Sequence, residues 1–138
     1  MFSAVTNIEL AKANKWKTIQ SAETAAVGAS AGDNGYGVSF AMTDRDARYL
    51  ILATNTADSA TATVTVKAGN GINATAYEPS VTLAAGASAV IQVESGCFKH
   101  VKDAGAMKVE SSDASIVGKV FVVSTTAAVT VQVFHTVL

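Results

Sequence analysis

The chain has 138 residues, of which 49% are hydrophobic and 15% are charged, and its formal net charge is −1. Soluble domains average about 25% charged residues, so a low charged fraction with an ample apolar fraction disfavours disorder. The small net charge gives no electrostatic basis for binding nucleic acid or an anionic membrane. One cysteine excludes an internal disulfide framework and a multi-cysteine zinc site. The length fits one domain.

The N-terminal region differs in composition from the rest of the chain. It has no basic segment followed by an apolar run, so we predict no secretory signal, and no apolar run approaches the roughly 20 residues of a membrane-spanning helix. Residues 8–17 are compatible with a short helix or an extended arm, and residues 21–35 are mostly small or polar. We therefore predict an arm over residues 1 to about 20, a loop over 21–35, and synthesis in a cytoplasm.

From residue 36 onward the sequence is typical of β-structure. Apolar residues alternate with polar ones in 61–67 and 129–137, which predicts two half-buried antiparallel strands. The buried faces are predicted to carry Ala62, Val64 and Val66 in the first strand, and Val129, Val131, Val133, His135 and Val137 in the second.

Further short strands are predicted at 36–42, 48–54, 80–83, 87–94, 106–110 and 116–124. Turn residues separate them, for example Gly32-Asp33-Asn34-Gly35 and Gly69-Asn70-Gly71. Turn signals at this spacing predict an all-β protein with a single antiparallel β-sandwich, or small jelly-roll-like domain, over residues 36–138. Residues 1–35 are predicted to form the N-terminal arm and loop that precede this domain.

Cys97 and His100 are the nearest pair of potential metal ligands or catalytic groups, three residues apart in a predicted turn. A zinc site needs further ligands, and the only other histidine, His135, lies on a predicted strand. Nucleophilic catalysis needs a base and an orienting group beside the nucleophile, and no serine lies in a nucleophile-elbow glycine pattern. We interpret Cys97 as a small half-buried residue and His100 as a loop residue.

The acidic and glycine-rich segments also favour structural roles. Residues 44–48, Asp-Arg-Asp-Ala-Arg, are predicted to form a solvated turn, although Asp44, Asp46 and Asp103 are residue types that serve in acid–base pairs or calcium sites. Residues 67–71 follow a strand but lack the helix and the Lys-Ser/Thr signature of a phosphate loop. We therefore predict no catalytic residue, no metal site and no cofactor.

Several segments, taken in order, resemble the small β-sandwich proteins that tailed bacteriophages encode with their head genes, known as capsid decoration or cement proteins. The segments are 49–56, 61–71, 81–91, 94–99 and 108–113, followed by the valine-rich last strands. The resemblance covers about residues 36–138. It implies a non-catalytic structural virion protein that binds the outer surface of a phage head and stabilises it.

The same resemblance implies the partners and the location. The partners would be the major capsid protein and further copies of this chain, as a homotrimer, with no nucleic acid, membrane or small-molecule substrate. The protein would lie on the capsid surface of the virion after synthesis in the host cytoplasm. The arm would then act as a clasp, with interface candidates Phe2, Ile8, Leu10 and Trp16. Trp16 either folds back on the sandwich or docks on a neighbour, since aromatic residues are favoured interface anchors.

Two other classes of function remain open at this point. Small β-sandwiches also occur as components of phage tail tubes or fibres. A bacterial Ig-like or carbohydrate-binding surface module is the other alternative, for which Tyr36 and Tyr77 are the aromatic residues near loops. An enzyme is disfavoured, because the sequence assembles no set of catalytic groups.

Overall fold

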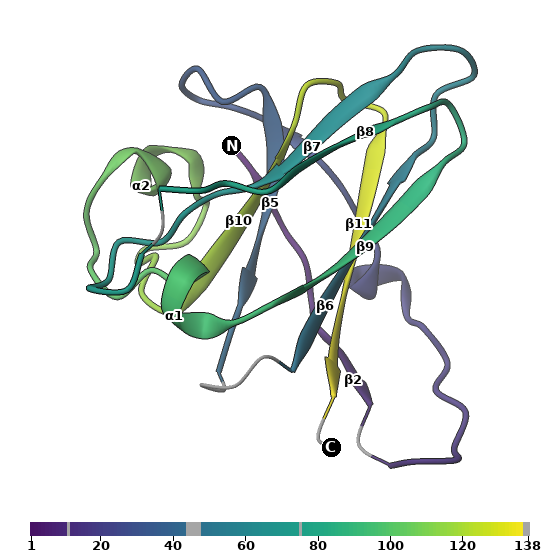
Figure 1. The fold of residues 1–138 in the computed structure, drawn as a ribbon, viewed down its shortest axis with the longest axis horizontal. Helices are drawn as coiled ribbons and strands as arrows, with labels where there is room; N and C mark the ends of the chain where they lie inside the picture. The colour runs from purple at the N-terminus through teal and green to yellow at the C-terminus, as the bar shows by residue number, and fades with distance from the viewer. Residues whose placement is uncertain (11, 44–47, 75, 137–138) are drawn as a thin grey trace.

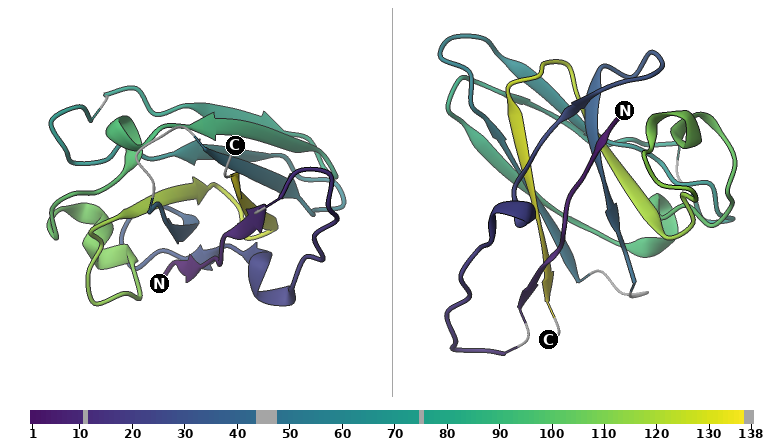
Figure 2. Two further views of the ribbon diagram at one scale, coloured as in Figure 1. Left: turned by 90° about the horizontal axis from the view of Figure 1, so that it is seen from below. Right: turned by 180° about the vertical axis from the view of Figure 1, so that it is seen from behind.

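The computed structural model describes residues 1–10, 12–43, 48–74 and 76–136. Two β-sheets pack face to face, and Figures 1 and 2 show the two layers with the two short α-helices gathered at one side. The predicted all-β sandwich is therefore confirmed. The sheets are mixed rather than purely antiparallel, because the strands nearest the N-terminus pair in parallel with their neighbours.

The first sheet has the order β1-β5-β10-β7-β8, with β4 also paired to β5. Its strands are β1 (Ser3–Ala4), β4 (Gly28–Ala29), β5 (Tyr36–Ala41), β7 (Ala62–Val66), β8 (Ser80–Leu83) and β10 (Lys119–Ser124). β1 runs parallel to β5, and the remaining pairs are antiparallel. β8 is thus one edge of this sheet.

The second sheet has the order β2-β11-β6-β9, with β3 also paired to β11. Its strands are β2 (Ile8–Leu10), β3 (Ala25–Ala26), β6 (Tyr49–Asn55), β9 (Ser88–Val93) and β11 (Val129–Thr136). β2 runs parallel to β11, whereas β3 and β6 run antiparallel to it. β2 and β9 therefore form opposite edges of the second sheet.

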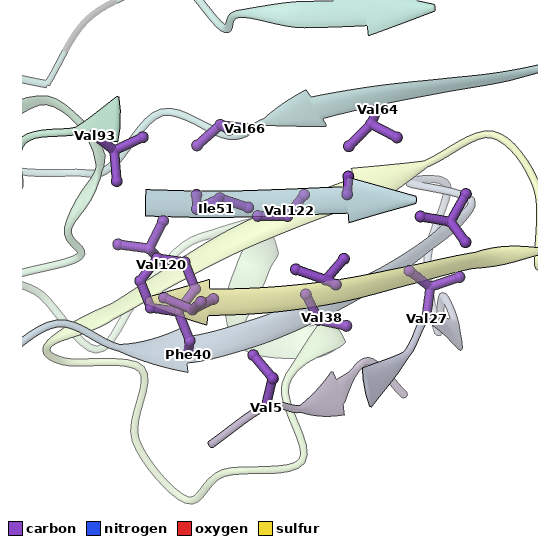
Figure 3. Packing of buried hydrophobic residues seen from close by; sticks show 14 of the residues in the cluster. Val5, Val27, Val38, Phe40, Ile51, Val64, Val66, Val93, Val120 and Val122 are labelled. Atoms are coloured by element: carbon purple, nitrogen blue, oxygen red, sulfur yellow. The ribbon is translucent and has the colours of Figure 1, made fainter. Parts of the chain in front are cut away.

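The main hydrophobic core lies between the two sheets (Figure 3). Strand β11 alternates strictly between buried and half-buried residues, and its buried side chains are Val129, Val131, Val133 and His135. Strand β7 buries Ala62, Val64 and Val66. Both faces agree with the predicted alternation; Val137 lies outside the described residues.

The N-terminal residues are part of the sandwich, which differs from the predicted arm. Phe2, Val5 and Ile8 are 1%, 6% and 0% exposed, and β1 and β2 belong to the two sheets. The predicted loop 21–35 contains the 3₁₀ turn η1 (Ser21–Glu23) as well as β3 and β4. Strands of two or three residues are too short to show a period. β1, β2 and β3 pair with strands far along the chain, whereas β4 pairs with the nearby β5. Residues 12–20, the remainder of the predicted arm, are all exposed.

The segment between β9 and β10 forms two short helices, α1 (Ser95–Phe98) and α2 (Ala106–Glu110). The predicted strand at 106–110 is therefore wrong. Its buried residues are Met107 and Glu110, which are three apart and share one helix face, whereas a strand would bury every second residue. A second small cluster, which includes Phe2, Met107, Ile116 and Phe121, fastens this segment to the first sheet.

Candidate interaction surfaces

Cys97 lies in helix α1, where Glu94 caps the N-terminus. The Glu94 carboxylate accepts hydrogen bonds from the backbone N–H groups of Gly96 at 2.9 Å and Cys97 at 2.6 Å. The Cys97 thiol also hydrogen-bonds Glu94, and this contact, with burial and the negative charge, raises the pKa of the thiol. A raised pKa keeps sulfur in its unreactive thiol form. The arrangement serves to begin the helix and does not activate a nucleophile.

His100 has separate partners from Cys97. Its ring meets Phe121 edge-on with centroids 5.1 Å apart, and its Nδ1 lies 3.2 Å from the carbonyl oxygen of Lys119. The side chain is 4% exposed, and burial lowers its pKa, although the Lys119 carbonyl opposes the shift. His100 thus lies in a loop, as predicted, but its ring is buried against Phe121 and is neutral at neutral pH.

Glu110 is the most completely buried carboxylate of the described residues, at 1% exposure. It accepts hydrogen bonds from the Ser30 hydroxyl, the Ala31 and Gly32 N–H groups and the Asn34 amide at 2.6–3.1 Å. Burial raises the pKa of this carboxyl, but the hydrogen bonds outweigh burial and hold the pKa below its usual value. All of these donors come from this chain, so the carboxylate holds a loop and is not available to a ligand.

A second polar contact, buried only on its histidine side, joins the first and last strands of the second sheet. His135 Nδ1 lies 2.6 Å from a carboxylate oxygen of Glu9, 126 residues away, and the His135 ring stacks on Tyr49 at 4.5 Å. The Tyr49 hydroxyl accepts the N–H of Thr43 at 2.9 Å. The alternation of β11 predicted that His135 faces the core, but no sequence spacing links it to Glu9.

The remaining candidates for acid–base or metal chemistry have structural roles or lie outside the described residues. Asp103 binds Lys108 at 2.8 Å and accepts the N–H of Ile116 at 3.0 Å. Asp44 and Asp46 belong to residues 44–47, which lie outside the described part of the chain. Among the residues that the structure describes, no group of three or more His, Cys, Asp or Glu side chains could hold a metal ion.

In the described part of the second sheet, the outer side of β6, β9 and β11 carries no charged side chain. The side chains that point away from the core on β6, β9 and β11 are all apolar, hydroxyl or amide groups, and we call them the uncharged face. Its members are Leu50, Leu52, Thr54, Ser88, Val90, Gln92, Thr130, Gln132, Phe134 and Thr136. The register places Leu52 beside Val90 and Leu50 beside Phe134, so the apolar members are contiguous. The members on β9 are exposed and those on β6 and β11 are half-buried. The outward side of a sheet ordinarily carries polar and charged residues.

The four predicted interface residues fall into different environments. Phe2 and Ile8 are buried inside their own chain, and Leu10 is half-buried in β2. Trp16 is fully exposed, so it does not fold back on the sandwich. Sequence reasoning did not identify the uncharged face, although the alternation in 48–54 and 129–137 gives its members once the buried side is known.

Comparison with known proteins gives no match: no family model, curated protein or solved structure is significantly similar to the chain. In the described residues, no helix is long and apolar enough to cross a membrane.

Proposed function

We propose that this protein is a non-catalytic structural protein of a phage virion, which binds the outer surface of the head and stabilises it. The order of the strand and turn segments resembles that of capsid decoration proteins, and this resemblance supports the proposal. The partners would be the major capsid protein and further copies of the chain, as a homotrimer. The buried ionisable groups Glu110, His100 and His135 all bind groups of their own chain, so none of them argues for catalysis.

The single observation that carries the proposal is the uncharged face. Charged residues are depleted at the centre of protein–protein interfaces, where desolvation of a charge would oppose association. The apolar residues Leu50, Leu52, Val90 and Phe134 lie at neighbouring positions, with amide and hydroxyl groups around them. Such a face fits a shell surface that is apolar and neutral at the point of contact.

Repetition would compensate for a weak single contact. A chain that is linked to other copies meets its second site on the shell at a raised effective concentration, so the assembly binds more tightly than one chain. The rigid sheet adds to this effect, because few groups on it lose conformational freedom on binding. The strand residues Thr54 and Ser88, for example, are joined by a 2.8 Å hydrogen bond between their hydroxyls.

The test is fractionation of particles from the source of the protein. Heads, tails and free protein are separated on a density gradient, and the chain is quantified in each fraction by mass spectrometry. Co-migration with heads at a fixed high ratio to the shell protein would support the proposal. Presence only with tails would assign the protein to the tail tube or a fibre, and absence from all particles would favour the Ig-like or carbohydrate-binding alternative.

A pair of variants tests the surface itself. Leu52→Lys places a charge in the uncharged face, and Thr63→Lys places the same charge on the outer side of β7 in the other sheet. We expect Leu52→Lys to reduce the amount bound to heads at least tenfold, while Thr63→Lys binds as the unmodified protein does. Equal binding of the two folded variants would overturn the assignment of this face.

A further inference from the structure

Trp16 is the only tryptophan of the chain, and it lies fully exposed on a projecting loop. Residues 12–20, which we call the Trp16 loop, connect β2 to η1, and every one of them is exposed. Figure 1 shows the loop extending away from both sheets at the lower right, and the rear view in Figure 2 agrees. Asn14 has a positive φ of 59° and forms the turn that precedes Trp16. Tryptophan is usually largely buried, so such a position suggests a contact outside the chain.

An apolar groove opens on another side of the molecule, between the edge strands β8 and β9. The two strands are joined by a hairpin and diverge from it, each at the edge of a different sheet (Figure 1). The groove has a volume of about 200 Å³ and reaches the interior between the sheets. Its lining is aliphatic, and includes Ile51, Ala53, Val64, Val66, Val81 and Ile91. Val81 remains 39% exposed at this opening.

The groove suits an indole ring in size and polarity. An aliphatic cavity of about 150 Å³ in another protein holds a benzene molecule, so a groove of 200 Å³ can take up much of an indole. A tryptophan side chain buries about 150–250 Å² when it is enclosed, which makes it an effective anchor. The exposed indole and the open groove are thus complementary in chemistry.

The charges around the two features are also complementary. The Trp16 loop contains Lys12, Lys15 and Lys17 and no acidic residue. Glu94 follows directly after β9, three residues beyond the lining residue Ile91, and it is exposed. The hydrogen bond with the Cys97 side chain and those with the Gly96 and Cys97 N–H groups lower the pKa of Glu94 despite some burial, so it is ionised at neutral pH. Lys12 or Lys15 of a docked loop would face this negative charge.

The loop and the groove cannot meet within one chain. The loop extends from β2, the groove lies beside β9, and β11 and β6 separate these two strands in the sheet. We propose that the Trp16 loop of one copy docks in the β8–β9 groove of a second copy. The two surfaces of this contact are different, so the contact is heterologous, and it generates a closed ring or an open chain of copies.

This inference deepens the proposed function by naming the residues through which copies would associate. It leaves the uncharged face free to bind a shell except at Val90, which lies at the β9 edge of that face and also lines the groove. Its test uses purified protein without phage particles. Failure would therefore remove this mode of self-association, whereas failure of the proposed function would appear only in the particle fractionation.

Because Trp16 is the only tryptophan, its fluorescence reports directly on the contact. We expect its emission to shift to the blue, and its quenching by acrylamide to fall at least twofold, as the concentration is raised to about 1 mM. Sedimentation velocity over the same range should show a larger species. An indole that stays equally quenchable at every concentration would overturn the proposal.

Paired variants distinguish this specific contact from nonspecific hydrophobic association. Trp16→Ala should abolish the larger species, whereas Ile72→Ala, which removes another fully exposed apolar side chain, should leave it unchanged. Val81→Asp charges the groove, and Thr82→Asp places the same charge on the same exposed strand but at the next position, on its other face. We expect loss of the blue shift only in Val81→Asp, with circular dichroism confirming that both variants are folded.

A second and independent check is a mixture of Trp16→Ala with Val81→Asp. Each variant keeps one half of the contact, so the mixture should form heterodimers that neither variant forms alone, and their absence would contradict the proposal.

Discussion

The Glu110 carboxylate accepts a 2.6 Å hydrogen bond from the hydroxyl of Ser30, 80 residues earlier in the chain. The same carboxylate binds the N–H groups of Ala31 and Gly32 and the side chain of Asn34. One buried charge therefore joins helix α2 to the loop that leads into β5. This contact couples the helical segment to the first sheet more specifically than apolar packing does.

Replacement of Glu110 by Ala should lower the free energy of unfolding at neutral pH by about 1.5–3 kcal/mol, since hydrogen bonds to a buried charge are lost. The pKa of Glu110 in the folded protein lies below its unfolded value. Its contribution is therefore present above the unfolded pKa, about 4.3, and disappears as the pH falls through the folded pKa. Urea unfolding at neutral and acidic pH measures the difference between the two proteins. A difference that does not shrink in acid would contradict this role.

Val131→Asp should unfold the domain. Val131 is 0% exposed in β11, between the two sheets, and an unpaired carboxylate there would lose its hydration without gaining a partner. Thr130→Asp, at the adjacent position on the outer side of the same strand, is the control and should stay folded. Circular dichroism and thermal unfolding distinguish the two variants. A cooperatively folded Val131→Asp protein would show that the register of β11 is wrong.

The N-terminal residues should be necessary for folding. The sequence predicted that residues 1 to about 20 form an arm that precedes the sandwich, but Phe2, Val5 and Ile8 are buried in it. Phe2→Ala should reduce the stability by about 3–5 kcal/mol through cavity formation. Replacement of residues 12–20 by a short glycine–serine linker should cost far less, because that segment is exposed. Urea unfolding of both variants tests the contrast, and equal stabilities would argue against an integral N-terminus.

Cys97 should react slowly with iodoacetamide at neutral pH. Its hydrogen bond to Glu94 raises the pKa of the thiol, so the reactive thiolate is scarce. Glu94→Gln removes the negative charge and should increase the rate of alkylation several-fold. Mass spectrometry at timed intervals measures the rate for this single cysteine. Equal rates would indicate that the carboxylate does not control the thiol.

The sequence predicts the long strands well because their periodicity is a local property. The alternation in β7 and β11 identifies the buried faces, since each residue in a strand faces opposite to the next. The uncharged face follows from the same alternation. Its apolar members, such as Leu50 and Phe134, were not recognised because only the pairing of β6 with β11 brings them side by side.

The errors concern segments whose structure depends on distant partners. The strands β1 and β2 have two and three residues, so no period can be read from them. Helix α2 has only five residues, and the alternation of apolar and polar side chains in it is typical of a strand. The sequence does not show that Glu110 is buried and hydrogen-bonded to Ser30, a contact that depends on the folded structure. The groove between β8 and β9 is likewise invisible in the sequence, since it arises where the edges of two sheets diverge.

The pairing of β2 with β11 also determines when the protein can finish folding. Glu9 and His135 are in contact although 126 residues separate them, and β11 is the last strand of the chain. During synthesis β2 leaves the ribosome long before β11 exists, so these two strands can pair only after β11 has emerged, whereas β6 and β9 can pair earlier. Closing so long a loop is entropically costly, and such non-local pairing slows folding. We therefore expect the pairing of β2 with β11 to be a late step in the folding of the second sheet.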